Sequence, residues 1–359
     1  MNRFNGRLAL QQRVLPGYRA PFFDLLAAAC DGGMSLFTGA PRANEGIATT
    51  DRLQVANYQI GKNIHLFGGA FYLCYQQGLA NWLKAWNPDA LIVEANPRYL
   101  STPAVVNWMR KRDQPVIGWG LGAPPASGFR EKRRVNFLRQ FDALIAYSQH
   151  GADEYADLGF PLDRIFTAHN SILPSPTWEL PSRPSTFNLQ PVILFVGRLQ
   201  FRKNVDLLLG ACAEIQNVRL IVVGDGPERE SFEELAAEIF PSAEFVGAKH
   251  GAELKPYFEE ADLFVLPGTG GLAVQEAMGY GLPVIVAQGD GTQNDLVRAG
   301  NGWQVPPDDF EALVAAMRKA LSDTARLRTM GAESYRIVKE EINIERMVDT
   351  FVKALNAVQ

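Results

Sequence analysis

Short apolar runs alternate with helix-like segments along the whole chain. Most runs hold four or five consecutive residues that are almost all apolar, a length and composition typical of parallel strands buried on both faces. The clearest runs are 8–10, 90–93, 115–118 and 143–146 in the first half, and 192–196, 219–223, 243–246, 263–266 and 284–286 in the second. This alternation predicts an α/β protein with one doubly wound sheet in each half.

A proline-rich stretch separates the two halves. Its prolines are Pro174, Pro176, Pro181, Pro184 and Pro191. Prolines at this density prevent both helix and central strand, so we expect a linker at 173–190 between a first domain at 1–172 and a second at 191–340. Two helical stretches are expected from Phe310 onward, and the last segment, 341–359, carries an apolar stripe at helical spacing that needs a surface to cover. The stripe comprises Ile342, Ile344, Met347, Val348, Phe351, Val352 and Leu355.

The composition is that of an ordinary folded protein. The chain has 359 residues, of which 47% are hydrophobic and 21% charged, which excludes disordered, collagen-like and coiled-coil chains. The sequence contains no run of 18 apolar residues, so we expect no membrane span. No signal-peptide pattern is seen at the N-terminus. The three cysteines, Cys30, Cys74 and Cys212, lie far apart in the sequence and form none of the paired spacings that hold zinc. We therefore expect buried, reduced thiols in a cytoplasmic protein.

The net charge of −4 conceals an asymmetry, because residues 1–180 carry an excess of four positive charges and residues 181–359 an excess of eight negative ones. The basic run from Arg130 to Arg134, with Arg139, supplies five of the positive charges. One interpretation is a solvated helix face. The other is that the first half faces an anionic phospholipid surface or a phosphorylated acceptor, which would make the protein peripheral at the inner membrane face.

The second half holds cations where an open α/β sheet binds ligands. Gly197 ends an apolar run, and Arg198 and Lys203 follow in the loop that leads into a helix. Strand ends and helix N-termini favour anionic ligands, so two cations converging there would form a diphosphate clamp. The alternative is that both are surface charges.

Two glycine turns follow. Gly224 and Gly226 lie in a strand-to-helix turn, where glycine permits positive φ. The turn at 268–271 leads into a helix that begins near Leu272, whose free amides would face a phosphate. Glu276 lies about one turn into that helix. It would reach a hydroxyl-rich group such as ribose or, alternatively, only compensate the helix dipole.

In this order and spacing, the motifs resemble those of a known family. They are Gly-Arg-Leu-x-x-x-Lys from Gly197, Gly-Asp-Gly-Pro from Gly224, Phe-Val-Gly from Phe245, Ala-Asp-Leu-Phe-Val-Leu-Pro from Ala261, and Gly-Gly-Leu-x-x-x-Glu-Ala-Met from Gly270. The set is similar to the donor-binding domain of retaining nucleotide-sugar glycosyltransferases of family four. The resemblance implies a GT-B fold, in which two Rossmann-like domains face each other across a cleft and the last helix crosses back to the first domain.

The resemblance also implies roles for individual residues. Arg198 and Lys203 match the diphosphate-binding pair and Glu276 the ribose-binding glutamate, and these three are the expected catalytic group. The remaining donor-site candidates are Gly17, Val246, Gly247, Gly270, Gly271, Leu272, Ala273 and Val274. Among them Val246 and Gly247 match the wall against the base, and Gly17 lies in a first-half loop that donor phosphates would approach.

The acceptor-side candidates follow strand-like runs of the first half. They are Arg13, Arg19, Asn96, Arg98 and His150, for each of which a packing or surface role is the alternative. The sequence departs from the family at two places. Gly268 stands where the family usually carries a first glutamate, and Leu121 or a neighbour stands where relatives carry a histidine. Sugar recognition is therefore expected to differ, or the register of the loop to be shifted.

The function expected is transfer of a sugar, with retention, from a nucleoside diphosphate sugar to the hydroxyl of a glycan, a lipid-linked sugar or a small molecule. UDP is favoured over GDP as the donor nucleotide. The sequence contains no Asp-x-Asp pair that would suggest a metal, so we expect neither a metal nor a cofactor. We also expect no nucleic-acid partner. The alternatives are a nucleotide-sugar epimerase or a phosphorylase on the same fold, and a non-catalytic nucleotide-sugar-binding protein.

Overall fold

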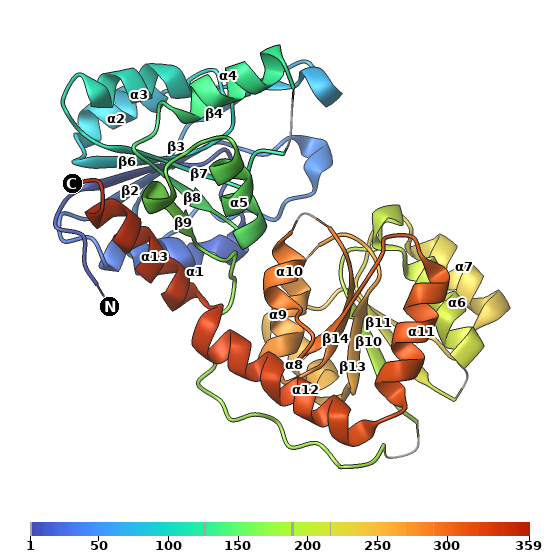
Figure 1. The fold of residues 1–359 in the computed structure, drawn as a ribbon. Coiled ribbons are helices and arrows are strands. Elements are labelled where there is room, and N and C mark those ends of the chain that lie inside the picture. The colour runs from blue at the N-terminus through green and yellow to red at the C-terminus, as the bar shows by residue number, and fades with distance from the viewer. Residues whose placement is uncertain (1, 125–126, 188–189, 216, 271, 290) are drawn as a thin grey trace. The chain divides into compact units, whose positions relative to one another are not determined.

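The computed structural model describes residues 2–124, 127–187, 190–215, 217–270, 272–289 and 291–359. The chain divides into two compact units (Figure 1). Unit 1 comprises Met1–Ile172 together with Ile344–Gln359, and unit 2 comprises Leu173–Asn343. The last segment of the chain therefore belongs to the same unit as the first.

Unit 1 is built on a parallel sheet of seven strands in the order β3-β2-β1-β6-β7-β8-β9. The strands are β1 (Leu8–Gln11), β2 (Met34–Thr38), β3 (Asn57–Ile60), β6 (Ala90–Glu94), β7 (Val116–Gly120), β8 (Ala143–Ala146) and β9 (Ile165–Thr167). The helices are α1 (Ala20–Ala28), α2 (Leu79–Trp86), α3 (Thr102–Arg110), α4 (Phe129–Leu138) and α5 (Gln149–Asp157). The antiparallel pair β4 (Lys62–Leu66) and β5 (Leu73–Gln77) stands apart from this sheet. The strand order reverses direction between β1 and β6, which is where open α/β sheets bind ligands.

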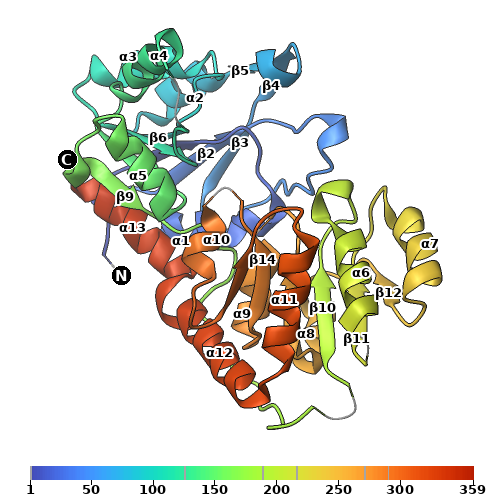
Figure 2. The ribbon, with the colours of Figure 1, turned by 45° about the vertical axis from the view of Figure 1, so that its right-hand side comes forward.

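Unit 2 repeats the plan with six parallel strands in the order β12-β11-β10-β13-β14-β15. The strands are β10 (Val192–Val196), β11 (Arg219–Val223), β12 (Glu244–Gly247), β13 (Leu263–Leu266), β14 (Val284–Ala287) and β15 (Gly302–Val305). The helices are α6 (Val205–Ile215), α7 (Arg229–Ile239), α8 (Lys255–Glu260), α9 (Leu272–Gly279), α10 (Thr292–Leu296), α11 (Phe310–Leu321) and α12 (Thr324–Arg336). Here the reversal falls between β10 and β13. Figure 2 shows the helices on both faces of this sheet.

The C-terminal helix α13 (Ile344–Asn356) packs on α1 within unit 1. The apolar stripe read from the sequence is buried throughout, from Ile342 to Leu355, so the stripe covers a core rather than solvent. Phe351 lies edge-on to Phe22 of α1 at 5.0 Å between ring centroids and to Trp119 of β7 at 4.9 Å. Such aromatic pairs add to the burial of apolar area, which is the main stabilising contribution.

The structure differs from the sequence expectation at the C-terminus and at several strands. Three α-helices rather than two helical stretches follow Phe310, because residues Ile337–Glu341 form a short π-helical turn before α13 begins at Ile344. The patterns missed β2, β3, β9, β15 and the β4–β5 pair. All three cysteines are buried free thiols. No helix in the described part of the chain is both long enough and apolar enough to cross a bilayer.

The proline-rich stretch is irregular, as expected, but it is not a free linker. It belongs to unit 2, where Trp178 Nε1 donates to the carbonyl of Gly279 at 3.1 Å. Arg183 donates to the carbonyls of Phe258, Ala261 and Tyr280 at 2.7, 3.0 and 2.8 Å. These carbonyls lie at the C-terminal ends of α8 and α9, where carbonyl groups have no hydrogen-bond partner within the helix. The stretch therefore closes two helix ends with one guanidinium.

We expect Arg183→Ala to lower the free energy of unfolding of unit 2 by about 2–4 kcal/mol, since it removes several charge-assisted hydrogen bonds and leaves buried carbonyls unpaired. Burial lowers the pKa of Arg183 to about 10, with the nearby charge of Arg328 acting in the same direction, so the group stays charged at neutral pH. Urea unfolding measures the change. Arg326→Ala, on the exposed side of α12, is the control, and equal stability of both variants would contradict the capping role.

Candidate active site

Three loops meet at the carboxyl edge of the unit 2 sheet. Gly197 N–H donates to the carbonyl of Val223 at 3.0 Å, Leu199 N–H to that of Asp225 at 2.9 Å, and Gly224 N–H to that of Gly247 at 2.9 Å. The loops after β10, β11 and β12 are thereby held to one another. This edge is therefore preorganised by backbone hydrogen bonds.

Both glycines of the second loop are required by close contacts with the first loop, and one of them also has positive φ. Gly224 has φ +151°, and a Cβ there would overlap the carbonyl oxygen of Gly197. Gly226 does not have positive φ, but a Cβ at this position would overlap the carbonyl of Leu199. The close approach of the two loops thus excludes any side chain at either position.

Lys203 ends a short 3₁₀ turn after β10 (Phe201–Lys203) and points into the loop after β13. Its side chain is 9% exposed, and Nζ donates to the carbonyl of Thr269. A Cβ added to Gly270 would overlap Nζ, so the ammonium lies directly against this glycine turn. Lys203 therefore occupies the point where the strand order reverses between β10 and β13.

The charge of Lys203 is not balanced by a carboxylate in the described part of unit 2. Burial lowers the pKa of Lys203 to about 8, and the neighbouring charge of Arg202 lowers it further. A buried cation without a carboxylate partner is costly unless an anion binds beside it. The site is therefore electrostatically suited to an anionic ligand.

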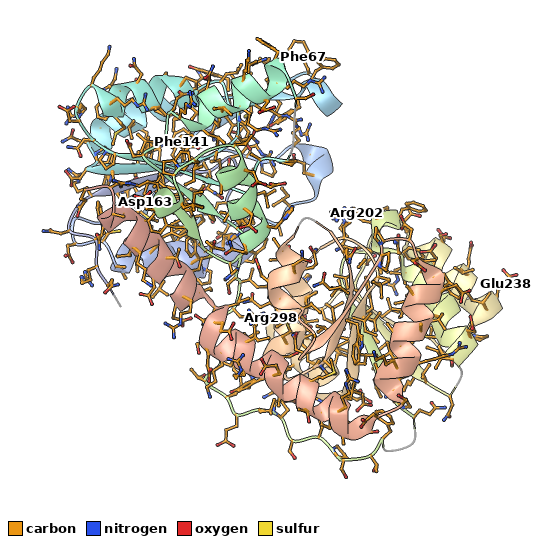
Figure 3. The ribbon with its side chains drawn as sticks, in the orientation of Figure 1. Phe67, Phe141, Asp163, Arg202, Glu238 and Arg298 are labelled. Carbon is orange, nitrogen blue, oxygen red and sulfur yellow. The ribbon has the colours of Figure 1, made fainter. Side chains whose placement is uncertain are left out.

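Arg202, which the sequence analysis did not single out, contributes a second cation to this turn (Figure 3). Its guanidinium donates to Thr269 Oγ1 at 2.9 Å and to Gln200 Oε1 at 3.1 Å. The available signal was the pair of adjacent cations, Arg202 and Lys203, in the loop that begins with Gly197 after β10. Arg198 follows Gly197 in the same loop and is exposed.

Helix α9 begins at Leu272, as expected, directly after the glycine turn. The amides of Leu272, Ala273 and Val274 lie in its first turn, where N–H groups have no partner within the helix. The first turn carries no acidic residue that would occupy those amides. Gly271, another predicted donor-site residue, lies outside the described residues.

Glu276 lies one turn into α9 and is partly buried. Burial raises the pKa of Glu276 to about 6. No hydrogen bond or ion pair of its carboxylate is found in the described part of the chain. Val246 and Gly247 lie at the end of β12, where the carbonyl of Gly247 is held by Gly224 and its φ is +75°.

The position of Gly268 explains why a glutamate is absent there. A Cβ at residue 268 would lie 2.5 Å from Lys203 Cα and would overlap the carbonyl of Arg202. The glycine turn therefore packs directly on the backbone that carries Lys203. Any side chain at this position would displace that backbone, so the departure from the family pattern is built into the packing of the loop.

In unit 1 the structure contradicts one predicted acceptor-side residue. Arg19 is only 5% exposed, and its guanidinium donates to Asn170 Oδ1 and lies 5.5 Å from the centroid of the Trp119 ring. A weaker contact joins it to Met347 Sδ at 3.7 Å. Arg19 therefore ties the first helix region to α13, and it is not available to an acceptor.

The other first-half candidates remain at the surface or at strand ends. Arg13 follows β1 and forms an ion pair with Glu45 at 2.9 Å. Asn96 Oδ1 accepts from the amide of Arg98 at 3.0 Å and so shapes the turn after β6. His150, in the first turn of α5, pairs with Glu154 at 3.4 Å.

Two expectations remain: that donor phosphates approach the loop at Gly17, and that Leu121 stands where relatives carry a histidine. A Cβ at Gly17 would lie 3.8 Å from the carbonyl of Ala48, an ordinary contact, so packing within the chain does not require glycine there. Leu121, where a histidine was expected from the resemblance, is exposed.

The strand ends of unit 1 also carry a polar network that the sequence analysis missed. Glu94 Oε2 accepts from the amide of Arg13 at 2.9 Å, and Gln76 Nε2 donates to the carbonyl of Gln12 at 3.0 Å. Burial raises the pKa of Glu94 to about 7. The network joins β1 and β6 at the reversal of strand order. Gln76 comes from the β4–β5 pair, which the sequence patterns did not predict.

No group of His, Cys, Asp or Glu among the described residues is arranged to hold a metal ion. The unit 2 edge presents the ammonium of Lys203 and the free amides of α9, with the carboxylate of Glu276 one helix turn away.

Comparison with known proteins identifies this arrangement. The two parallel-sheet units define a GT-B fold: HepE from Anabaena, solved in complex with UDP, superimposes with a TM-score of 0.71 at 16% identity, covering 99% of this chain and 100% of HepE. Sucrose-phosphate synthase from Thermosynechococcus elongatus superimposes with a TM-score of 0.70 at 19% identity, covering 98% of each chain. These likenesses establish the fold.

Residues 177–337, which make up most of unit 2, match the model of the glycosyl transferases group 1 family, so this part of the chain is a glycosyl transferases group 1 domain. The lipopolysaccharide core biosynthesis glycosyltransferase LpsE of Rhizobium meliloti is 24% identical over 304 residues, covering 76% of this chain and 87% of LpsE. A GDP-mannose-dependent alpha-mannosyltransferase of Mycobacterium tuberculosis is 38% identical over 125 residues, covering 34% of this chain and 32% of that relative. The higher identity is thus confined to about a third of the mannosyltransferase.

Proposed function

We propose that this protein is a retaining glycosyltransferase that moves a sugar from a nucleoside diphosphate sugar, with UDP preferred, to a hydroxyl acceptor in the synthesis of a polysaccharide, glycolipid or other glycoconjugate. The observation that carries the proposal is the buried, carboxylate-free cation of Lys203 at the strand reversal of unit 2. The alpha-mannosyltransferase among the relatives, which is GDP-mannose-dependent, supports a nucleoside diphosphate sugar as the donor. The UDP complex of HepE supports the choice of UDP.

In this proposal the residues divide the work by charge. Lys203, Arg198 and the amides of α9 stabilise the negative charge that develops on the departing diphosphate, the main electrostatic task of the reaction. Arg202 is added to this group on the strength of its place beside Lys203. Glu276 accepts hydrogen bonds from the ribose hydroxyls. With the leaving group stabilised in this way, the acceptor attacks from the face that the diphosphate leaves, and the configuration is retained.

The test is an assay of nucleotide release with UDP-glucose, UDP-galactose, UDP-N-acetylglucosamine and GDP-mannose, each with and without a panel of hydroxyl acceptors. Acceptor-dependent release from a UDP-sugar, with an α-linked product by NMR, is expected. Release from GDP-mannose alone would correct the nucleotide, and a β-linked product would overturn retention. Conversion of the donor without an acceptor would favour an epimerase.

One observation keeps a non-catalytic nucleotide-sugar-binding protein as a second candidate. The glycine turn leaves no room for a side chain at residue 268, the place of the family's first glutamate. Donor binding without hydrolysis or transfer in the same assay would decide for this candidate.

The affinity for UDP is expected to be highest between about pH 6 and pH 8. Below pH 6 the Glu276 carboxylate, whose pKa is raised to about 6, becomes protonated and can no longer accept from two hydroxyls. Above pH 8 the Lys203 ammonium, whose pKa is lowered to about 8, loses its charge. One pH unit outside either limit should weaken binding about tenfold.

Calorimetric titration with UDP over this pH range measures the effect. The Glu276→Gln variant should bind UDP more weakly at neutral pH. Its affinity should no longer fall below pH 6, the acid limb of the profile, but should still fall above pH 8, the alkaline limb. An acid limb that persists in Glu276→Gln would assign it to another group.

A further inference from the structure

The β4–β5 hairpin of unit 1 turns its apolar side chains outward. Along its two strands, Asn63, His65, Cys74 and Gln76 face inward, while the cross-strand pairs Ile64–Tyr75 and Leu66–Leu73 lie on the opposite face. The inward groups are satisfied. Asn63 Nδ2 donates to the carbonyls of Arg13 and Ala40 at 2.8 and 2.9 Å, and His65 Nδ1 lies 2.9 Å from Tyr72 Oη.

The outward face is exposed, which is the reverse of the usual pattern for a strand pair. Ile64, Leu66 and Tyr75 are 36%, 38% and 44% exposed, and at the tip Phe67 and Phe71 reach 75% and 80%. Figure 3 labels Phe67 at the outer end of this hairpin. Large aromatic groups gathered on one projecting element are not the scattered surface apolar residues of an ordinary protein.

The basic run of the sequence lies at the same edge of unit 1 as the hairpin. The hairpin is anchored next to Arg13, just past the carboxyl end of β1. Helix α4 follows the carboxyl end of β7 and runs back toward the start of β8, so its N-terminal turns lie at the same carboxyl edge. Both elements are at the upper end of unit 1 in Figure 1 and in Figure 2.

Half of the exposed residues of α4 are cationic. Arg130, Lys132 and Arg133 are exposed, Glu131 is the single acidic residue of the helix, and Phe129 at its start is 74% exposed. Near the hairpin, Lys62 and Arg98 add positive charge, and Glu45 is already paired with Arg13 and Arg42. This edge therefore combines exposed aromatic groups with a positive field.

We propose that this edge, formed by the hairpin tip and the N-terminal half of α4, docks on an anionic phospholipid bilayer. Phe67, Phe71 and the outward strand residues enter the headgroup region, and Arg130 and Arg133 contact the lipid phosphates. Apolar insertion combined with basic contacts is the chemistry of interfacial membrane binding, in which each basic side chain near an anionic surface contributes about a fivefold gain in binding. A protein partner or a second copy would not require the combined dependence on acidic lipid and on aromatic side chains.

Sedimentation of the full chain with vesicles of phosphatidylcholine, alone or mixed with phosphatidylglycerol, tests the proposal. Binding is expected to the mixed vesicles and to be at least tenfold weaker to phosphatidylcholine alone, consistent with the loss of several basic contacts. Phe67→Ala combined with Phe71→Ala should reduce binding to mixed vesicles. Arg130→Gln combined with Arg133→Gln should reduce it by about 25-fold, fivefold for each charge.

Matched control variants lie elsewhere on unit 1. Leu162→Ala removes an equally exposed apolar side chain, and Lys84→Gln with Lys111→Gln removes two exposed charges from α2 and the end of α3. Both should bind like the original protein, with all variants checked by thermal unfolding. A Phe67→Trp variant should show a blue shift of its added emission with mixed vesicles.

Three outcomes would overturn the proposal. They are no binding of the original protein to mixed vesicles, binding that the hairpin and α4 variants leave unchanged, and light scattering that shows a dimer lost in the Phe67→Ala, Phe71→Ala variant. The last would assign the surface to a second copy. The assay contains no nucleotide sugar, so its result is independent of the proposed transfer reaction.

Discussion

Lys203→Met is expected to lower turnover by about 10²–10³, because the side chain supplies a preorganised positive charge where negative charge develops on the leaving diphosphate. Methionine keeps a side chain of similar length in the buried position, so folding should be retained. The measurement is the initial rate of nucleotide release with donor and acceptor at saturation, at a pH below 8 where Lys203 is charged.

Lys255→Met is the matched control, since Lys255 is an exposed lysine of unit 2 that pairs with Glu259 at 3.7 Å. Its turnover should equal that of the original protein. A Lys203→Met variant with normal turnover would remove Lys203 from the site.

Gly268→Ala should inactivate the protein to a similar degree without touching a charged group. The added methyl would overlap the carbonyl of Arg202 and lie 2.5 Å from Lys203 Cα, so the backbone carrying both cations must move. A misplacement of about 1 Å in catalytic groups costs about 10² in rate. For the same reason Gly268→Glu should lose activity rather than gain a sugar contact.

Gly300→Ala is the control for this glycine substitution. Its Cβ would lie 3.6 Å from Glu333 Cγ, an ordinary contact, and its φ is not positive. Rates and thermal unfolding of the two variants separate a local displacement from general destabilisation. Equal activity of Gly268→Ala and Gly300→Ala would show that the turn tolerates movement.

The sequence predicts the strands that carry continuous apolar runs and fails where burial is one-sided or the strand is polar. Strands β8, β10, β11 and β13 follow their runs closely. Strand β2 is fully buried but interrupted by Ser35, so its pattern is not a continuous apolar run. The β4–β5 hairpin alternates with its apolar side outward, and nothing in one sequence says which face of an alternating strand is solvated.

The candidate site shows the same limit. Local motifs locate Lys203, Glu276 and the start of α9, because each depends on residues close together in the chain. They do not show that Gly268 packs on Lys203, since that contact joins residues far apart in sequence. They also misplace Arg19, which follows a strand and a glycine as a ligand-binding residue would but is covered by Trp119 and α13. Burial by a distant helix is a tertiary effect that local patterns do not contain.

The most direct test of the account compares the calorimetric affinities of UDP and UMP for the original protein and for Lys203→Met. The account predicts that the original protein binds UDP at least tenfold more tightly than UMP, the gain expected from a charge-assisted contact to the second phosphate, and that this difference largely disappears in Lys203→Met. Equal affinity for UDP and UMP in the original protein, or a preference for UDP that survives the substitution, would contradict it.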